Sequence, residues 1–145
     1  MNSVGADATG TSMMGETILV ADDEPVVRSY VEGILQRAGF NVIEAVDGVD
    51  ALRQVDQRHA PIDLLLTDVR MPRMDGIALA RSVLERFPKT PVLYISGYSF
   101  DLREERALLS GASSAFLPKP FSRQELVGAV QKLLDSRSGA FGAGD

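Results

Sequence analysis

Acidic residues stand directly after two short apolar runs of this 145-residue sequence, where their carboxylates could bind a metal ion. Asp22 and Asp23 follow the apolar run at 18–21, and Asp68 follows the run at 64–67. Carboxylates that lie close together repel one another, so at neutral pH either one of them takes up a proton or a cation lies between them. A hard divalent cation with oxygen ligands, such as Mg²⁺, suits a group of this kind.

Two further polar side chains follow later apolar runs. Ser96 ends the run that starts at Val92, and Lys119 lies between two prolines after the run at 115–117. A fixed ammonium beside acids can neutralise one of them and bind an anion such as a phosphoryl group. A serine hydroxyl can donate a hydrogen bond to a phosphoryl oxygen. Taken singly, each residue also has an ordinary interpretation, as a solvated surface lysine or a serine at the end of a strand.

The acids have a second interpretation as helix caps, because the N-terminus of a helix attracts carboxylates. This interpretation stays open for Asp22 and Asp23 when they are considered alone. For Asp68 it is weaker, because Asp75 precedes Gly76 and the next helical pattern and is better placed as the cap. Asp68 is therefore left for another role.

The elements that must position these residues alternate between strand and helix. Apolar runs predict five strands, at residues 18–21, 41–45, 64–67, 92–95 and 115–117. Apolar positions at helical spacing predict a helix after each strand. These helices run from Pro25 to about Gly39, from the turn at 47–48, from 77 to Pro88, over about 101–110, and from a capping box formed by Ser122 and Glu125.

Five consecutive β-α units predict an α/β fold of the flavodoxin-like (βα)5 type, a doubly wound parallel sheet with helices on both faces. The third and fourth strands are uniformly apolar, as central parallel strands are. The second strand carries Asn41 and Glu44 and the fifth is very short, so both are expected at the edges. This favours the strand order 2-1-3-4-5. Ligands of such sheets bind beyond the carboxyl ends of the strands, where Asp22, Asp68 and Lys119 would meet.

Length and composition predict one domain at residues 16–136, between flexible tails at 1–15 and 137–145 that are rich in small residues. Hydrophobic residues make up 45% of the chain, enough for a single core. The net charge of −5 argues against nucleic acid as a partner, and the lack of cysteine excludes disulfides and thiolate metal sites. Without a membrane-spanning run or a secretory pattern, we expect a cytoplasmic protein that does not bind membranes.

Four segments of the sequence resemble, in order, the receiver domain of two-component response regulators. They are the run Ile18–Pro25 with its two aspartates, the stretch from Asp68 to Gly76, the pair Ser96-Gly97, and Lys119-Pro120-Phe121. All four segments stand, in this order, at the ends of predicted strands. The residues around Ser96 and Lys119 also resemble receivers of hybrid histidine kinases. A single-domain regulator and the receiver of a longer hybrid kinase therefore both remain open.

The resemblance implies that Asp68 accepts a phosphoryl group from a histidine kinase or a histidine phosphotransfer protein, giving an acyl phosphate. It implies Mg²⁺ as the cofactor, bound directly by Asp23, by Asp68 and by the backbone carbonyl of Arg70, with Asp22 acting through a coordinated water. Phosphoryl transfer depends mostly on positioning and charge stabilisation, which a metal ion and a lysine supply. The chain would be no enzyme beyond catalysing its own phosphorylation and slow dephosphorylation.

The resemblance also implies a conformational switch. Ser96 and Lys119 would contact the phosphoryl group, the Lys119-Pro120 peptide would be cis, and Phe116 stands at the position of the switch aromatic residue. Charge added at Asp68 would recruit Ser96 and let Phe116 turn, changing the face of the fourth helix, fifth strand and fifth helix. An unidentified output partner would read this face, and phosphorylated copies can pair as homodimers. Phe116 as an ordinary core residue remains the alternative.

An enzymatic alternative is a Mg²⁺-dependent phosphohydrolase with an aspartate nucleophile. Phosphohydrolases of the haloacid dehalogenase type carry the nucleophile after their first strand in an Asp-x-Asp pattern, whereas this sequence has Asp22-Asp23-Glu24 there. Flavin binding, another use of flavodoxin-like folds, is disfavoured because the acidic loop after the first strand would repel a phosphate.

Overall fold

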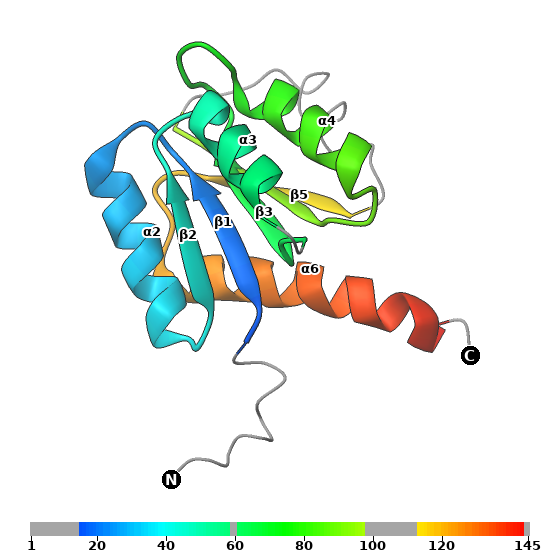
Figure 1. Cartoon of the computed structure of the whole chain (residues 1–145). Helices are drawn as coiled ribbons and strands as arrows, with labels where there is room; N and C mark the ends of the chain where they lie inside the picture. The colour runs from blue at the N-terminus through cyan, green and yellow to red at the C-terminus, as the bar shows by residue number, and fades with distance from the viewer. Residues whose placement is uncertain (1–14, 59–60, 98–112, 144–145) are drawn as a thin grey trace, which may run out of the picture.

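The structure is a computed structural model that describes residues 15–58, 61–97 and 113–143, with side chains described as far as residue 137. Its strands form one parallel sheet in the order β2-β1-β3-β4-β5, which confirms the predicted fold class and strand order (Figure 1). The strands are β1 Thr17–Ala21, β2 Asn41–Ala45, β3 Leu64–Asp68, β4 Val92–Ser96 and β5 Ser114–Pro118.

The helices described are α2 Pro25–Arg37, α3 Gly48–Gln57, α4 Gly76–Arg86 and α6 Arg123–Ala143. Asp75 caps α4 as predicted, because its carboxylate accepts a hydrogen bond of 2.8 Å from the backbone N–H of Ala78. None of these helices is long and apolar enough to cross a membrane. The helix expected at about 101–110 and most of the expected N-terminal tail lie outside the described residues.

The sheet separates two apolar cores because alternate side chains of a strand point to opposite faces. Ile18 and Val20 of β1 pack with α2 and α6 on one face. Leu19 and Ala21 pack on the other face, under α3 and α4. The same alternation repeats in β3 and β4, where every residue is buried. The central strands are therefore packed on both faces of the sheet. This packing fixes the positions of the residues at their carboxyl ends.

The last helix, α6, runs past residue 136, where the sequence analysis places the end of the domain. We predicted a flexible tail from residue 137, whereas α6 continues to Ala143. Arg137 forms ion pairs with Asp63 at 3.0 Å and with Glu16 at 3.2 Å, so it belongs to the folded part. The apolar period ends before Arg137, and these ion pairs join residues far apart in sequence, so the local pattern did not reveal them.

The capping box at the start of α6 provides a test of local stability. Ser122 Oγ accepts from the N–H of Glu125 at 3.0 Å, and the Glu125 carboxylate accepts from the N–H of Ser122 at 2.8 Å. Ser122→Ala should lower the free energy of unfolding by about 1 kcal/mol, because one of these bonds is lost. Ser29→Ala, on the exposed surface of α2, is the control and should change stability by no more than about 0.5 kcal/mol. Urea denaturation measures both, and equal effects would contradict the cap.

Candidate functional site

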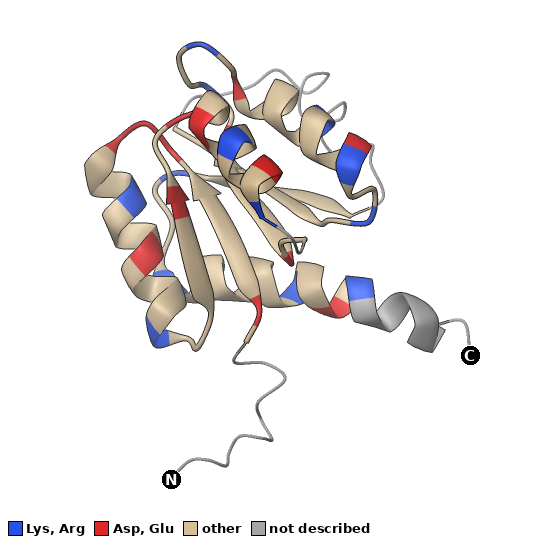
Figure 2. Ribbon diagram, in the orientation of Figure 1, with Lys and Arg blue, Asp and Glu red and all other residues tan. Residues whose placement is uncertain are grey.

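The predicted site residues meet at the carboxyl ends of four strands. Asp22 follows β1, Asp68 ends β3, Ser96 ends β4 and Lys119 follows β5. Parallel pairing of β1 with β3, of β3 with β4 and of β4 with β5 places these strand ends side by side. Acidic residues also line the loop that joins β1 to α2 (Figure 2). The topology thus brings together four residues that the sequence spreads over almost 100 positions.

Three carboxylates form a group at this edge of the sheet. Among the described residues, Asp22, Glu24 and Asp68 each contribute an oxygen atom, and these atoms all lie within 4.8 Å of one another. Asp22 is fully buried. Its Oδ1 accepts a hydrogen bond of 2.9 Å from the backbone N–H of Glu24, whereas its Oδ2 has no hydrogen-bond partner. The group therefore contains a buried carboxylate oxygen that still lacks a ligand.

Lys119 supplies the positive charge of the site. Its Nζ lies 3.1 Å from Asp68 Oδ2, 3.3 Å from Glu24 Oε1 and 3.6 Å from Asp22 Oδ2. The last distance is an ion-pair contact but is too long for a hydrogen bond. Burial alone would lower the pKa of Lys119, but the hydrogen bond to Asp68 and the charges of both aspartates outweigh it and raise the pKa. The ammonium is therefore charged at neutral pH.

The single positive charge of Lys119 does not compensate the negative charges of the three carboxylates. Burial raises the pKa of Asp22 from 3.8 to about 6, and the charge of Asp68 adds to the effect. The N–H of Glu24 and the ammonium of Lys119 act in the opposite direction but offset it only in part. Oxygen ligands, surplus negative charge and the unpartnered Oδ2 of Asp22 are what a hard divalent cation requires. The residues present therefore fit Mg²⁺.

The composition of the acidic group differs from the set expected from sequence. Glu24 belongs to the group, although no role was predicted for it beyond its place in the Asp-Asp-Glu motif. Asp23, expected as a direct metal ligand, is exposed, and its role stays a prediction. The reach of the Glu24 side chain toward Lys119 depends on how β1 and β5 are placed, which the motif does not encode.

The loop after β3 folds back tightly on Asp68. The backbone N–H of Gly76 donates to the carbonyl of Val69 at 2.8 Å, and the N–H of Arg70 donates to Asp68 Oδ1 at 3.3 Å. A Cβ at Gly76 would overlap the backbone oxygen of Asp68. The loop thus holds Arg70 next to the Asp68 carboxylate, and metal binding by the Arg70 carbonyl stays a prediction.

The remaining site residues lie on β4 and β5. Ser96 is buried, and its carbonyl accepts a hydrogen bond of 2.8 Å from the N–H of Lys119. The Lys119-Pro120 peptide is cis, as expected. Phe116 is half-buried against the core under α3 and α4, in register with Tyr94. Its role as a switch stays a prediction, because the expected fourth helix lies outside the described residues.

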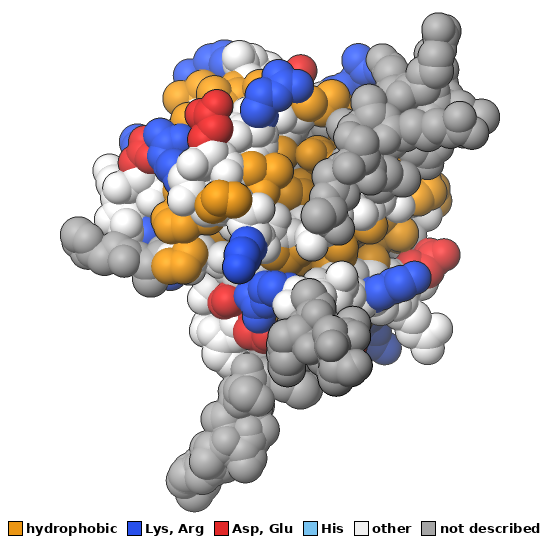
Figure 3. Space-filling view, turned by 90° about the vertical axis from the view of Figure 1, so that its right-hand side faces the viewer, with side chains coloured by type: hydrophobic (Ala, Val, Ile, Leu, Met, Phe, Trp, Pro, Cys, Tyr) orange, Lys and Arg blue, Asp and Glu red, His pale blue; other side chains and the backbone are white. Residues whose placement is uncertain are grey.

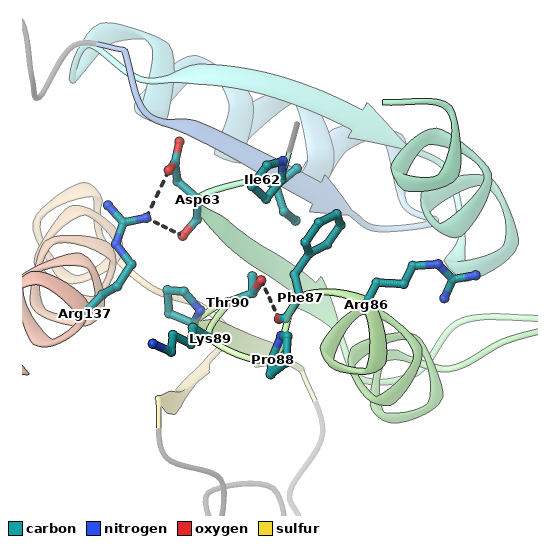
Figure 4. Close-up of a pocket in the computed structure, with 10 residues that line it drawn as sticks. Ile62, Asp63, Arg86, Phe87, Pro88, Lys89, Thr90 and Arg137 are labelled. Atoms are coloured by element: carbon teal, nitrogen blue, oxygen red, sulfur yellow. Dashed lines mark hydrogen bonds and ion pairs between the residues drawn. The ribbon is translucent and has the colours of Figure 1, made fainter. Parts of the chain in front are cut away.

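A pocket of about 380 Å³ lies at the opposite end of the sheet (Figure 4). Its lining includes Ile62 and Phe87, and Arg137 on its rim is already paired with Asp63. Hydrophobic side chains also gather on the face that lies to the right in Figure 1, with Lys and Arg around them (Figure 3). The pocket has no cluster of carboxylates with a lysine, so the site for chemistry is the one at Asp68.

The buried Asp22 carboxylate should destabilise the metal-free protein more at neutral pH than at acidic pH. Because its pKa in the folded protein, about 6, exceeds the ordinary value of 3.8, the folded state binds this proton more tightly. The unfavourable contribution of Asp22 is fully present above about pH 6, declines as the pH falls from about 6 toward 3.8, and is absent below that ordinary pKa. Asp22→Asn should therefore raise the free energy of unfolding by about 1–3 kcal/mol at about pH 7.

Urea denaturation with a metal chelator, at about pH 7 and about pH 4, measures this effect. Asp56→Asn is the matched control, because Asp56 is an exposed carboxylate paired with Arg86 at 2.7 Å. The control should change stability by less than about 1 kcal/mol. A loss of stability in Asp22→Asn at neutral pH would contradict the picture of an uncompensated buried charge.

Known proteins share both the sequence and the fold of this chain. The family model of the response regulator receiver domain matches residues 18–131. The sensor kinase CckA of Brucella abortus is 36% identical over 121 residues, which cover 83% of this chain but only 13% of the kinase. The response regulator receiver protein CpdR of the same species is 34% identical over 122 residues, which cover 81% of this chain and 95% of CpdR.

A solved structure supports the same conclusion. The crystal structure of a response regulator receiver protein from Sinorhizobium medicae WSM419 is 36% identical and superposes with a TM-score of 0.74, over 86% of this chain and 98% of that one. The residues that the family model matches, 18–131, include all five strands except Thr17 of β1, and they include the site at the carboxyl ends of the strands. The chain therefore belongs to the response regulator receiver domain family.

Proposed function

We propose that this chain is the phosphoacceptor of a two-component phosphorelay and that Asp68 takes the phosphoryl group from a phosphohistidine. The observation that carries the proposal is the contact of 3.1 Å between Asp68 Oδ2 and Lys119 Nζ, within a group of three carboxylates. This contact combines a nucleophile, a fixed positive charge and the oxygen ligands of a metal ion at one place. Phosphoryl transfer needs those three components.

In this reaction a carboxylate oxygen of Asp68 forms a bond to phosphorus while the bond from phosphorus to the histidine nitrogen breaks. The proton that the departing imidazole needs comes from the donor protein or from water. Lys119 would pair with a phosphoryl oxygen, and Ser96 would donate a hydrogen bond to another phosphoryl oxygen after the transfer. A bound Mg²⁺, held by Asp68 with Asp22, Asp23 or Glu24 and the Arg70 carbonyl, would neutralise charge on the phosphoryl oxygens.

The rim of the site supports docking of a protein donor. Among the described residues, the large hydrophobic side chains that stay exposed are Val26, Tyr30, Val46 and Val49. Val26 and Tyr30 lie on the first turns of α2, and the Tyr30 hydroxyl donates to the carbonyl of Phe121 at 3.2 Å, two residues after Lys119. We infer that a histidine kinase or a histidine phosphotransfer protein binds at these exposed apolar side chains, since exposed apolar patches are typical of protein interfaces.

The output of the module is the second part of the proposal. Phosphorylation adds negative charge at Asp68, which attracts the Ser96 hydroxyl and favours a movement of Phe116. The surface that includes β5 and α6 would change with it and bind an output partner or a second phosphorylated copy. The half-buried position of Phe116 supports this role, because a fully buried ring would have no space to turn.

Intact-mass measurement after incubation with Mg²⁺ and acetyl phosphate tests the proposal. A single, persistent phosphoryl adduct is the expected result. Continuous release of phosphate without an adduct would favour the phosphohydrolase alternative. If neither acetyl phosphate nor a phosphorylated histidine kinase gives an adduct, the proposal is wrong.

A further inference from the structure

An ion pair links the loop that follows Asp68 to the start of α3. The guanidinium of Arg73 donates from Nη2 to Oδ2 of Asp47, across 26 positions of sequence. Asp47 is only 5% exposed, whereas the side chain of Arg73 is 63% exposed. The other oxygen of Asp47 accepts the N–H of Asp50 at 2.8 Å as the N-cap of α3. Both oxygens of this buried carboxylate are thus used, one for its own helix and one for the loop.

The backbone at Arg73 shows that the loop is held from outside. Its φ of 71° lies in the left-handed region, which residues other than glycine, asparagine and aspartate rarely adopt. Nothing in the arginine side chain favours this conformation locally, so the contacts around the loop must maintain it. The hydrogen bond from Arg73 also lowers the pKa of Asp47, and the N–H of Asp50 adds to the effect. Asp47 is therefore a charged partner at neutral pH.

A second contact joins the same two segments. A Cβ at Gly48 would lie 2.5 Å from the carbonyl oxygen of Met74, so the first turn of α3 packs directly against the loop backbone. The loop itself is short and closed, because the N–H of Met74 donates to the carbonyl of Pro72 at 2.8 Å. A shift of Arg73 would thus move the whole loop, which includes Arg70 next to Asp68.

We propose that Arg73 is a positioning residue for the phosphoacceptor site, which acts through Asp47 to hold the loop that carries Arg70. This inference rests on the function proposed above for Asp68. It differs from an ordinary surface ion pair, which contributes little, because one partner is buried and the pair joins two loops. The consequence is that Mg²⁺ affinity and the rate of adduct formation depend on a side chain that contacts neither the metal nor the phosphoryl group.

The variants are chosen to remove the charge pair and leave the backbone intact. Arg73→Asn keeps a residue that tolerates the left-handed region, and Asp47→Asn keeps an N-cap acceptor for α3. Arg73→Lys restores a positive charge and tests rescue. Arg53→Asn is the matched control, because the Arg53 side chain is about as exposed as that of Arg73 and pairs with Asp50, which does not belong to the loop.

The first measurement is hydrogen exchange of the backbone amides of residues 69–76 in the metal-free protein. We expect faster exchange in Arg73→Asn and in Asp47→Asn, no further increase in the double variant, and partial recovery in Arg73→Lys. Arg53→Asn should exchange like the wild type. Unchanged exchange in Arg73→Asn, or single effects that add in the double variant, would overturn the inference, whatever the outcome of the phosphorylation experiment.

The second measurement is Mg²⁺ affinity, followed by NMR titration, together with the rate of adduct formation from acetyl phosphate. Arg73→Asn should weaken Mg²⁺ binding by about tenfold and slow adduct formation, as expected for an outer residue that orients a ligand. Faster loop exchange with wild-type Mg²⁺ affinity and rate would overturn the positioning role. A wild-type chain that neither binds Mg²⁺ nor forms an adduct would instead contradict the proposed function. The exchange data would still decide whether the ion pair of Arg73 with Asp47 holds the loop.

Discussion

Asp68→Asn should abolish the phosphoryl adduct. The amide of asparagine has nearly the shape of the carboxylate but is a far weaker nucleophile for phosphorus, and it cannot form an acyl phosphate. The variant also loses the charge that pairs with Lys119 at 3.1 Å and that contributes to the acidic group. After incubation with Mg²⁺ and acetyl phosphate, the intact mass of the variant should equal that of the untreated protein, whereas the wild type should gain one phosphoryl group.

Asp56→Asn is the control for this experiment, because it removes an exposed carboxylate of α3 outside the acidic group. It should form the adduct as fast as the wild type does. An adduct of undiminished amount in Asp68→Asn would mean that another residue accepts the phosphoryl group. The assignment of Asp68 would then be wrong even if the chain remained a receiver.

Gly76→Ala should destabilise the fold by at least about 3 kcal/mol. The added Cβ would overlap the backbone oxygen of Asp68 and would lie 3.0 Å from Oγ1 of Thr67. These atoms belong to the end of β3, which is buried throughout and cannot move aside cheaply. The expected result is a large shift of the urea midpoint, or failure to fold. Circular dichroism during denaturation measures it.

The matched control is Gly128→Ala in α6, where no atom lies within 4 Å of the added Cβ. This exposed helical position should gain about 0.5–1 kcal/mol, because alanine restricts the unfolded chain and favours helix. Equal stability of the two alanine variants would show that β3 and the loop can separate without cost. The tight packing described around Asp68 would then be incorrect.

The strength of the sequence signal differed between the fold and the site. Strands and helices were predictable because apolar periodicity and turn residues act locally, as at Asp75 before α4 and at Ser122 before α6. The strand order was predictable from the polar residues on β2 and from the short apolar run at 115–117, which favoured edge positions, although β5 itself is as long as the other strands. Topology then placed Asp22, Asp68, Ser96 and Lys119 at one edge, since parallel strands all end on the same side.

The local pattern does not reveal contacts that join distant segments. The end of the domain was placed before residue 137 because the apolar period ends there. The ion pairs of Arg137 with Asp63 and Glu16 bridge more than 70 positions, and they extend the folded part. The ion pair of Arg73 with Asp47 could not be predicted from the sequence either, because both residues stand in segments that are typical of ordinary turns.

By itself the sequence determined which residues could do chemistry here, a set of aspartates and one lysine after apolar strands, and it determined the edge of the sheet where they meet. Only the tertiary structure decided that Glu24 joins Asp22 and Asp68, that Oδ2 of Asp22 is buried without a hydrogen bond, and that Lys119 contacts all three acids. The physical reason is that burial and the distances between charges depend on atoms from several strands. These quantities are set only when the strands pack together, so residue types and spacing alone do not reveal them.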